Sequence, residues 1–487
     1  MGLGLETILI FVIFALLYVG LVRGQARQWM LLGASVMAVF WLQPWLPLRY
    51  ADFVLPSLTL ALTVVGWWAT RRQGDEGIQP VQRNDWVALG VVLGLALLMG
   101  MNRYLAAELR LTPSRPPGPT IWLTIITGTA MVLAATSWLL RQGKQKTVLL
   151  SGIILLLTLF VILKTPALAQ TLARWWRGLV GQDTSLASPL DLRWLGFSYV
   201  SFRLIHTLRD RQTGLLPELG LAEYVTYVIF FPAFIAGPID RAERFQRDWL
   251  ALPGIRGWDA SRLGEGGMRI LVGMFKKFVI ADTLAMGMAL TPELARASHS
   301  MPALWGLLYG YAFRLYFDFA GYTDIAIGVG IILGIRLPEN FKRPYLSTDI
   351  TSFWQRWHIT LSNWVRFYLF SPLTRSLLRR KPRPSSTLIV FIGLMATMIA
   401  IGLWHGIAWT FFVWGVWHGL GLFIHKQWSD RTRKWYRQLG AHPWRKRAWT
   451  AFAWVITFHF VVLGWVWFLI PDINLAARTF LRLLGLN

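Results

Sequence analysis

The sequence predicts an all-α protein that crosses a membrane many times. Of its 487 residues, 55% are hydrophobic and only 15% are charged, whereas soluble domains have roughly 25% charged residues. Apolar runs of about 20 residues, the length of helix that spans the hydrocarbon core of a bilayer, recur along the whole chain. Because lipid cannot satisfy irregular backbone or open sheet edges, helices are the simplest way to build such a chain. We expect a polytopic bundle with about 11–13 membrane segments, some of them broken or re-entrant.

The charge balance has its origin in the loops. The chain has 49 Lys and Arg against 24 Asp and Glu, and the basic residues crowd the short loops between apolar runs, as orientation in a membrane requires. The excess therefore indicates membrane topology, and we expect no nucleic-acid partner. The chain contains no cysteine, which excludes disulfides, thiolate nucleophiles and Cys-based metal sites. No histidines and carboxylates stand at the spacing of a metal site, so we predict none.

Six helices are predicted in an N-terminal membrane region, residues 1–165. The first apolar run, at 5–21, lacks a basic start and a small-residue cleavage site, so we expect a retained helix. Loops after the first, third and fifth runs carry most of the Arg and Lys, which predicts that these loops are cytoplasmic and that the N-terminus lies outside. The other five runs lie near 29–47, 52–70, 86–101, 120–140 and 147–165.

The middle of the chain is less regular. Residues 166–194 contain Trp175-Trp176-Arg177 and are predicted to form an interfacial segment. In the core region that follows, residues 195–470, proline and glycine interrupt several apolar segments. Broken segments persist at membrane depth only where protein or a water-filled cavity satisfies their backbone groups, so we expect a cavity in this region.

Two clusters of basic residues predict the topology of the last part of the chain. About 40 mostly apolar residues separate basic clusters at 375–383 and 426–447, enough for two crossings of about 20 residues each. If both clusters are cytoplasmic, residues 387–425 form a hairpin whose tip, near 403–408, lies deep in the membrane or towards its outer face. The remaining segments are a crossing near 450–470 and an amphipathic tail at 471–487.

His405 is the first candidate for chemistry. It lies near the predicted hairpin tip, and we expect Gly402 and Gly406 to leave space on either side of it. A titratable group in an apolar membrane setting is a functional candidate by default. An imidazole with the ordinary pKa of about 6.5 can accept a proton from a hydroxyl that attacks an acyl carbonyl. The alternative is a histidine that only hydrogen-bonds a neighbouring helix. For His418, His425 and His459 we expect an imidazole that lies at the membrane interface or packs within the bundle.

His358 is the second candidate. It lies in an aromatic and polar stretch, residues 352–364. If that stretch is one helix, Gln355, His358 and Ser362 share a face, since residues three and four apart are neighbours. An ordinary interfacial helix explains the same pattern, so the residues alone leave both interpretations open.

Two acids stand in an apolar run upstream. Asp318 follows Arg314 by four residues, so an ion pair within one helix is the simplest interpretation. Asp324 lies about 120° away around a straight helix, so the acids form no catalytic pair unless Gly321 breaks the helix. This spacing disfavours a hydrolase that uses two acids.

Several motifs, in this order, resemble the membrane-bound O-acyltransferase (MBOAT) family, and among its members the bacterial branch of alginate O-acetyltransferases and teichoic-acid D-alanyltransferases. They are Phe-Phe-Pro-Ala-Phe-Ile-Ala-Gly-Pro-Ile-Asp-Arg at 230–241, Phe-Asp-Phe-Ala-Gly-Tyr-Thr-Asp at 317–324, Pro-Glu-Asn-Phe-Lys-Arg-Pro-Tyr at 338–345, Phe-Trp-Gln-Arg-Trp-His-Ile-Thr-Leu-Ser at 353–362 and Gly-Leu-Trp-His-Gly at 402–406.

The resemblance implies a mechanism. An acyl group, carried as a thioester by an acyl carrier protein or coenzyme A in the cytoplasm, would pass through a central tunnel to a hydroxyl outside. His405 corresponds to the catalytic histidine and His358 to a second histidine that lines the tunnel. The resemblance thus implies a multi-pass protein of the inner membrane, with no bound cofactor, surrounded by lipid and served by a cytoplasmic carrier and an extracytoplasmic acceptor or partner enzyme.

Other residues in or next to these motifs are expected to bind substrate. A nearby Trp or Asn363 is expected to donate a hydrogen bond to the developing oxyanion, a contact typically worth about 3 kcal/mol. The full set is Trp404, Asn363, Ser362, Arg356, Asp318, Tyr322 and Asp324. The chain departs from the family at Phe367, where relatives usually have an acid, and this leaves the substrate open. Two alternative functions also remain: a transporter or flippase of a lipid-linked substrate, and an acyl relay that needs a separate extracytoplasmic transferase.

Overall fold

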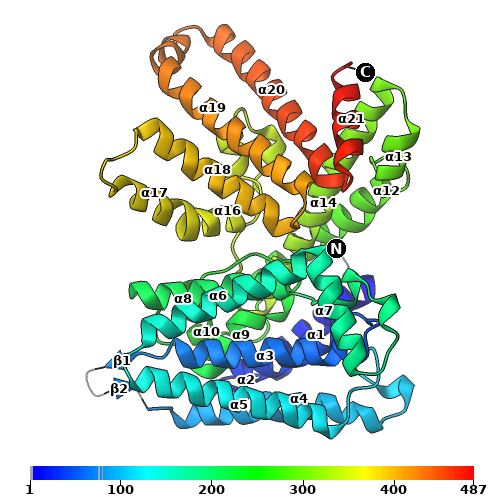
Figure 1. The fold of residues 1–487 in the computed structure, drawn as a ribbon, viewed down its shortest axis with the longest axis vertical. Coiled ribbons are helices and arrows are strands. Elements are labelled where there is room, and N and C mark those ends of the chain that lie inside the picture. The colour runs from blue at the N-terminus through cyan, green and yellow to red at the C-terminus, as the bar shows by residue number, and fades with distance from the viewer. Residues whose placement is uncertain (1–3, 75–76, 79, 487) are drawn as a thin grey trace. The chain divides into compact units, whose positions relative to one another are not determined.

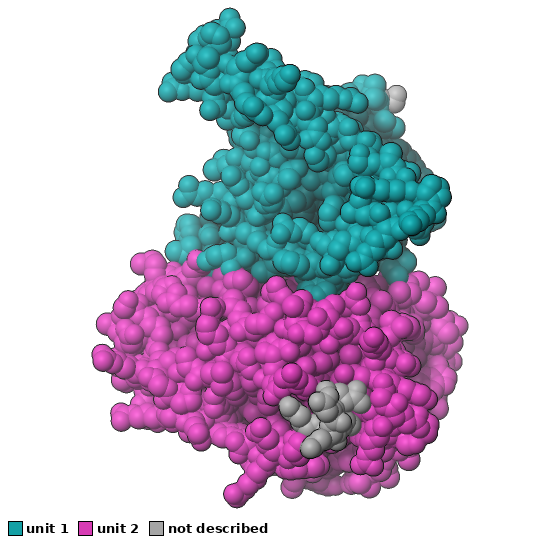
Figure 2. Space-filling model, turned by 90° about the vertical axis from the view of Figure 1, so that its left-hand side faces the viewer, with its two compact units in different colours: residues 1, 271–324, 339–487 teal, residues 2–270, 325–338 magenta. Residues whose placement is uncertain are grey.

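The structure is a computed structural model that describes residues 4–74, 77–78 and 80–486. It is almost entirely helical, as predicted (Figure 1). The chain divides into two compact units, shown in separate colours in Figure 2. Of the described residues, unit 2 contains those up to 270 and 325–338, and unit 1 contains 271–324 and those from 339 on.

All six predicted N-terminal helices are present in unit 2. They are α1 (Leu5–Leu21), α2 (Ala26–Trp41), α3 (Ala51–Ala69), α4 (Arg83–Met101), α5 (Pro119–Arg141) and α6 (Gln145–Lys164). Helix α2 ends six residues before the predicted boundary, because Pro44 and Pro47 remove backbone donors and restrict the residues that precede them. Between α3 and α4, the two-residue strands β1 (Gln73–Gly74) and β2 (Gly77–Ile78) pair antiparallel.

The rest of unit 2 is more broken. It contains α7 (Pro166–Leu179), α8 (Phe197–Thr213), α9 (Leu221–Ile229), α10 (Ala242–Ala251) and most of α11 (Ala260–Met274). Helix α9 ends before Pro232, and a 3₁₀ turn, Phe231–Ala233, follows it. The predicted interruption of an apolar segment by proline is therefore confirmed at Pro232.

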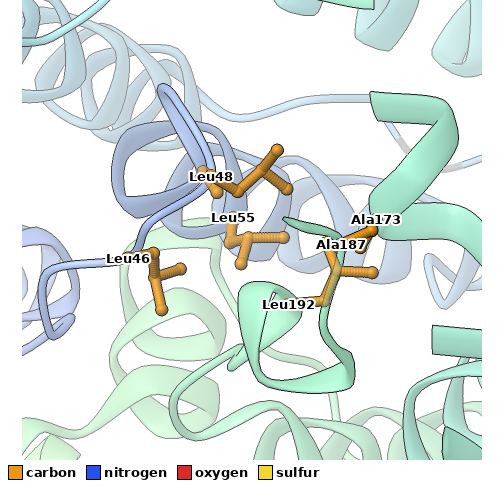
Figure 3. Close-up of a cluster of buried hydrophobic side chains, with 7 residues drawn as sticks. Leu46, Leu48, Leu55, Ala173, Ala187 and Leu192 are labelled. Atoms are coloured by element: carbon orange, nitrogen blue, oxygen red, sulfur yellow. The ribbon is translucent and has the colours of Figure 1, made fainter. Parts of the chain in front are cut away.

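Helix α7 buries one narrow face. Ala169, Ala173 and Arg177 are its buried residues, and their spacing of four places them on one side of the helix. Ala173 packs into a cluster of small and aliphatic side chains from the α2–α3 connection, α3 and residues 187–192 (Figure 3). Arg177 Nε donates to Asp191 at 2.6 Å. This one-sided burial agrees with the interfacial helix predicted here.

Unit 1 begins with the end of α11 and a π-helical segment, Phe275–Ala281, which leads into α12 (Asp282–Ala285). Helix α13 (Pro292–Ala297) follows, and then the long α14 (Met301–Leu333), whose residues up to 324 belong to unit 1. Unit 1 ends with α15 (Ile350–Trp354), α16 (Ile359–Val365), a π-helical segment (Arg366–Phe370), α17 (Ser371–Leu378), α18 (Ser386–His405), α19 (Trp409–Leu439), α20 (Pro443–Leu469) and α21 (Ile473–Leu483).

The predicted hairpin is confirmed. Helices α18 and α19 pack against each other, and residues 406–408 connect them, inside the predicted tip. Gly402 and Gly415 allow this packing, because a Cβ on Gly402 would lie 2.3 Å from the Phe411 carbonyl oxygen and one on Gly415 2.7 Å from Ile399 Cα. The amphipathic tail is also present, as α21.

Seven helices among the described residues are long and apolar enough to cross a membrane. They are α3, α4, α5, α6, α14, α18 and α20, and α1 and α9 are shorter apolar helices. On α5 and α6, large apolar side chains such as Leu123, Met131 and Ile154 are exposed, as expected of surfaces that face lipid. The chain is a polytopic helical membrane protein, and the region boundaries at 165, 194 and 470 stay predictions.

Candidate functional site

His405 is the last residue of α18 and is half-buried in an aromatic cluster. Its ring makes edge-to-face contacts with Trp404 and Phe468, at centroid distances of 4.5 and 4.6 Å. The expected space beside the ring is filled, because a Cβ on Gly406 would lie 2.8 Å from the Phe411 ring. The two glycines thus serve close packing of α18 on α19, and the prediction that they open access to His405 is wrong.

His358 lies at a break between two helices. Helix α15 ends at Trp354 and α16 begins at Ile359, with His358 as its N-cap in the left-handed region, at φ 43° and ψ 53°. The prediction that residues 352–364 form one helix is therefore wrong, and Gln355, His358 and Ser362 do not share a helix face. Contacts from outside the stretch cause the break: the Ile359 N–H donates to the Asn340 carbonyl at 2.9 Å.

Trp404 brings the two histidines into one site. Its ring centroid lies 4.5 Å from that of His405 and 6.1 Å from that of His358. On another side, Phe319 of α14 meets His358 edge-to-face at 4.8 Å. Low exposure (3%) of His358 and the aromatic walls exclude bulk water from this imidazole. The arrangement places two imidazoles and an indole in surroundings of low polarity, where hydrogen bonds to developing charge are strong.

The two acids of α14 have separate lysine partners. Asp318 Oδ1 accepts from Lys277 Nζ at 2.5 Å, and Asp324 Oδ2 accepts from Lys276 Nζ at 2.6 Å. The prediction that Arg314 is the ion-pair partner of Asp318 is wrong. Helix α14 continues through Gly321, so the helix break that could have brought the two acids together is absent at this glycine, and that the acids form no catalytic pair stays a prediction.

Close packing of α14 on the π-helical segment Phe275–Ala281 brings these lysines within hydrogen-bond distance of the two acids. A Cβ on Gly321 would lie 2.7 Å from the Gly273 carbonyl oxygen and 2.9 Å from Lys277 N, so glycine permits α14 to contact the π-helical segment. Sequence reasoning missed Lys276 and Lys277 because a helical period shows which face a residue occupies but not which distant segment meets it. Their signal was two adjacent cations inside an apolar run, which in a membrane need partners.

The other proposed substrate-binding residues lie at varied depths. Tyr322 is buried (1% exposed), Arg356 is half-buried and Asn363 is exposed. Ser362 Oγ donates to the Trp357 carbonyl at 3.3 Å. Trp404, a member of the proposed substrate-binding set, contacts both His358 and His405.

Phe367, the expected departure from the family pattern, belongs to the π-helical segment Arg366–Phe370. Its side chain is exposed (46%), and the Arg366 guanidinium lies 5.6 Å from its ring centroid. A cation over an aromatic face is attracted to it. The phenyl ring therefore contacts the neighbouring arginine through this cation–π interaction.

Three other histidines pack between helices, as predicted. His418 is fully buried, with Trp414 and Trp354 at ring-centroid distances of 4.8 and 5.2 Å. His459 Nε2 and the Tyr309 hydroxyl are 2.8 Å apart, and His425 Nδ1 is 2.9 Å from Thr351 Oγ1.

One group in unit 2 has the composition of a metal site that sequence spacing did not suggest. Ligand atoms of His206, Asp210 and Glu243 lie within 4.8 Å of one another. Protein donors already engage them: Arg241 contacts Asp210 at 3.5 Å and Glu243 at 3.0 Å, and the Ala242 N–H donates to His206 Nε2 at 3.2 Å. A metal ion would have to compete with the Arg241 guanidinium for both carboxylates.

Comparison with known proteins identifies a family. The model of the MBOAT, membrane-bound O-acyltransferase family, matches residues 118–466, more than half of the chain. A teichoic acid D-alanyltransferase of Streptococcus thermophilus is 35% identical over 286 residues, which cover 57% of this chain and 68% of that protein.

Two further relatives are acetyltransferases by name. A peptidoglycan O-acetyltransferase of Helicobacter pylori is 35% identical over 54% of this chain and 47% of its own length. A probable alginate O-acetylase of Pseudomonas fluorescens is 36% identical over 59% of this chain and 53% of its own length. The chain thus spans about half the length of these two acetyltransferases.

Proposed function

This chain belongs to the membrane-bound O-acyltransferase family and is a membrane acyltransferase, and from that premise we propose that it transfers an acetyl or D-alanyl group to a hydroxyl of a cell-envelope polymer. The observation that carries the proposal is the contact of one indole, that of Trp404, with both His358 and His405. Acyl transfer to a hydroxyl needs a group that accepts the hydroxyl proton and a donor for the oxyanion. Two imidazoles and an indole N–H are of these types.

The proposed step is an exchange of esters. The acceptor oxygen attacks the thioester carbonyl carbon, and His405 takes the hydroxyl proton as the new C–O bond forms. The C–S bond then breaks, and the leaving thiolate takes the proton from the imidazolium. The products are an O-acylated polymer and the free thiol, with the histidine restored. The Trp404 indole N–H is the proposed donor to the oxyanion.

The donor and acceptor follow from the same proposal. The donor is a cytoplasmic thioester, held by an acyl carrier protein or coenzyme A, and the acceptor is an extracytoplasmic polysaccharide, teichoic-acid-like polymer or glycolipid. The protein would then act in the inner (plasma) membrane, with a cytoplasmic carrier and an acceptor or partner enzyme outside. The names of the relatives, which modify teichoic acid, peptidoglycan and alginate, support a polymer acceptor.

We expect His405→Ala to lower transfer at least about 100-fold, the usual contribution of a positioned acid–base group. Membranes that contain the protein are given acetyl and D-alanyl thioesters with labelled acyl groups and a panel of polymers, and label in polymer ester is counted. His299→Ala is the matched control, since His299 is exposed and precedes α14. If His405→Ala, at equal protein level, transfers label as fast as His299→Ala, the role of His405 is wrong.

A further inference from the structure

Asn340 lies in the connection between α14 and α15 and is completely buried. Its side-chain oxygen Oδ1 lies within hydrogen-bond distance of three groups. Thr360 N–H lies 3.3 Å from it, Thr360 Oγ1 2.9 Å and His358 Nδ1 3.0 Å. The main-chain carbonyl of the same residue accepts from Ile359 N–H at 2.9 Å. One asparagine therefore binds three consecutive residues at the start of α16.

This geometry determines which nitrogen of His358 carries a proton. A backbone N–H can only donate, so the Asn340 atom that faces Thr360 N must be the carbonyl oxygen. The same oxygen has no proton to offer His358, so Nδ1 must be the donor. In a neutral imidazole, a proton on Nδ1 leaves Nε2 with a free lone pair.

We propose that Asn340 is a positioning residue that holds His358 as the Nδ1–H tautomer, so that its Nε2 accepts a hydrogen bond from the attacking hydroxyl. The inference rests on the proposed function and deepens it by giving the two histidines different tasks. His405 removes the proton, and His358 orients the hydroxyl through a bare nitrogen. The contact of Trp404 with the two histidines, on which the proposed function rests, assigns no role to Asn340 and no tautomer to His358.

One observation points to a ligand at Nε2, and a second shows that the surroundings of His358 enforce its conformation. This atom is buried and has no hydrogen-bond partner among the described protein atoms, although an unsatisfied buried polar atom costs about 1–3 kcal/mol. His358 is also one of three non-glycine residues with positive φ among those described. A strained conformation at an active site persists only when its surroundings enforce it, and Asn340 supplies the contacts that do so.

Two substitutions distinguish a role of Asn340 in positioning His358 from a role in folding alone. Asn340→Leu removes the acceptor at similar volume, and we expect turnover to fall about 100-fold with little change in KM for the thioester. Asn340→Asp keeps the acceptor and adds a charge, so it should restore much of the turnover. The carboxylate would favour the imidazolium and raise the pKa of His358. Because only neutral His358 has a free Nε2, the acidic limb of the pH–rate profile should move to higher pH in Asn340→Asp.

A spectroscopic reading tests the tautomer without activity. In detergent-solubilised full-length protein with ¹⁵N-labelled histidine, His358→Gln identifies the His358 signals by their loss. We expect a protonated Nδ1 and an unprotonated Nε2 in the parent protein, and a mixture of tautomers in Asn340→Leu. Asn474→Leu, an exposed asparagine on α21, is the control and should keep the parent spectrum and turnover.

The outcomes are distinguishable. An Nε2–H tautomer in the parent protein overturns the inference even if transfer depends on His405. An Asn340→Leu protein that keeps both the parent tautomer and the parent pH profile overturns it as well. If the tautomer is as expected but His405→Ala and His358→Gln transfer acyl groups normally, the proposed roles of the histidines fail while the tautomer stands.

Discussion

The orientation of the His358 imidazole depends on a residue 18 positions away in the chain. Its aromatic neighbours, Phe319 and Trp404, come from two other helices. Sequence spacing singled out His358 but assigned it to a continuous helix, and it passed over Asn340. The available signal was an amide inside the motif at 338–345, but a side chain in a connection has no periodicity that could indicate its partners.

At the same scale, Gly402 tests the packing of the hairpin. A Cβ there would lie 2.3 Å from a backbone oxygen of α19, which cannot rotate away. We expect Gly402→Ala to lower stability by about 1–3 kcal/mol, as overpacking commonly does, and to reduce transfer because His405 is three residues away. Thermal unfolding in detergent measures the first effect.

Gly128→Ala is the matched control for this substitution. Gly128 lies inside α5, and a Cβ there would meet nothing within 4 Å. Alanine favours helix over glycine by up to about 1 kcal/mol, so this variant should unfold at the same temperature as the parent or slightly higher. Equal unfolding temperatures for the two variants would contradict the close approach of α18 and α19.

Among the elements, the π-helical segment Phe275–Ala281 is the one whose role depends most on its partner. It presents Lys276 and Lys277 to Asp324 and Asp318 of α14. The period of α14 correctly separated the two acids, because angle around a helix follows from sequence spacing. It could not identify the lysines, since they belong to another element, and the nearest cation in sequence, Arg314, was the wrong choice.

We expect Lys277→Leu to destabilise the protein by about 1–3 kcal/mol, because it removes a buried cation (6% exposed) from the half-buried Asp318 carboxylate (25% exposed). The double variant Lys277→Leu with Asp318→Leu should recover most of that loss, since no uncompensated charge remains. Unfolding midpoints of the parent, both single variants and the double variant give the coupling energy.

An exposed pair on α19 provides the control. Lys426 Nζ lies 2.6 Å from Asp430, and both side chains are more than 40% exposed. Surface pairs contribute about 0–1 kcal/mol, so Lys426→Leu should barely change the unfolding midpoint. A Lys277→Leu effect no larger than that of Lys426→Leu would show that the Lys277–Asp318 contact does not stabilise the helix packing.

For the whole molecule, the orientation predicted from loop charge can be tested directly. The chain has no cysteine, so a single introduced thiol is the only site of maleimide labelling. In intact cells, a membrane-impermeant maleimide should label Gly4→Cys, at the predicted outer N-terminus, and should label Ser429→Cys, in the predicted cytoplasmic cluster, only after the membrane is opened. Both positions are exposed. The reverse pattern would mean that the orientation is inverted.

The sequence by itself determined the helical class, the N-terminal helices, the α18–α19 hairpin and the amphipathic α21. Each follows from the length, apolar content or charge of one continuous stretch of sequence. In a bilayer, apolar stretches of spanning length form helices and basic stretches form the loops between them. Sequence motifs also identified the family that the comparison confirmed. His405 and His358 were chosen from the sequence, and their catalytic roles stay predictions.

Only the tertiary structure decided how the candidate site is assembled. It broke the stretch at 352–364 at His358, placed Trp404 between two histidines, and matched Asp318 with Lys277. The physical reason is the same in each case. Hydrogen bonds and ring contacts between residues far apart in the chain contribute more free energy than local helix propensity does. That contribution cannot be estimated from one stretch of sequence, because the stretch does not show which distant residues it contacts.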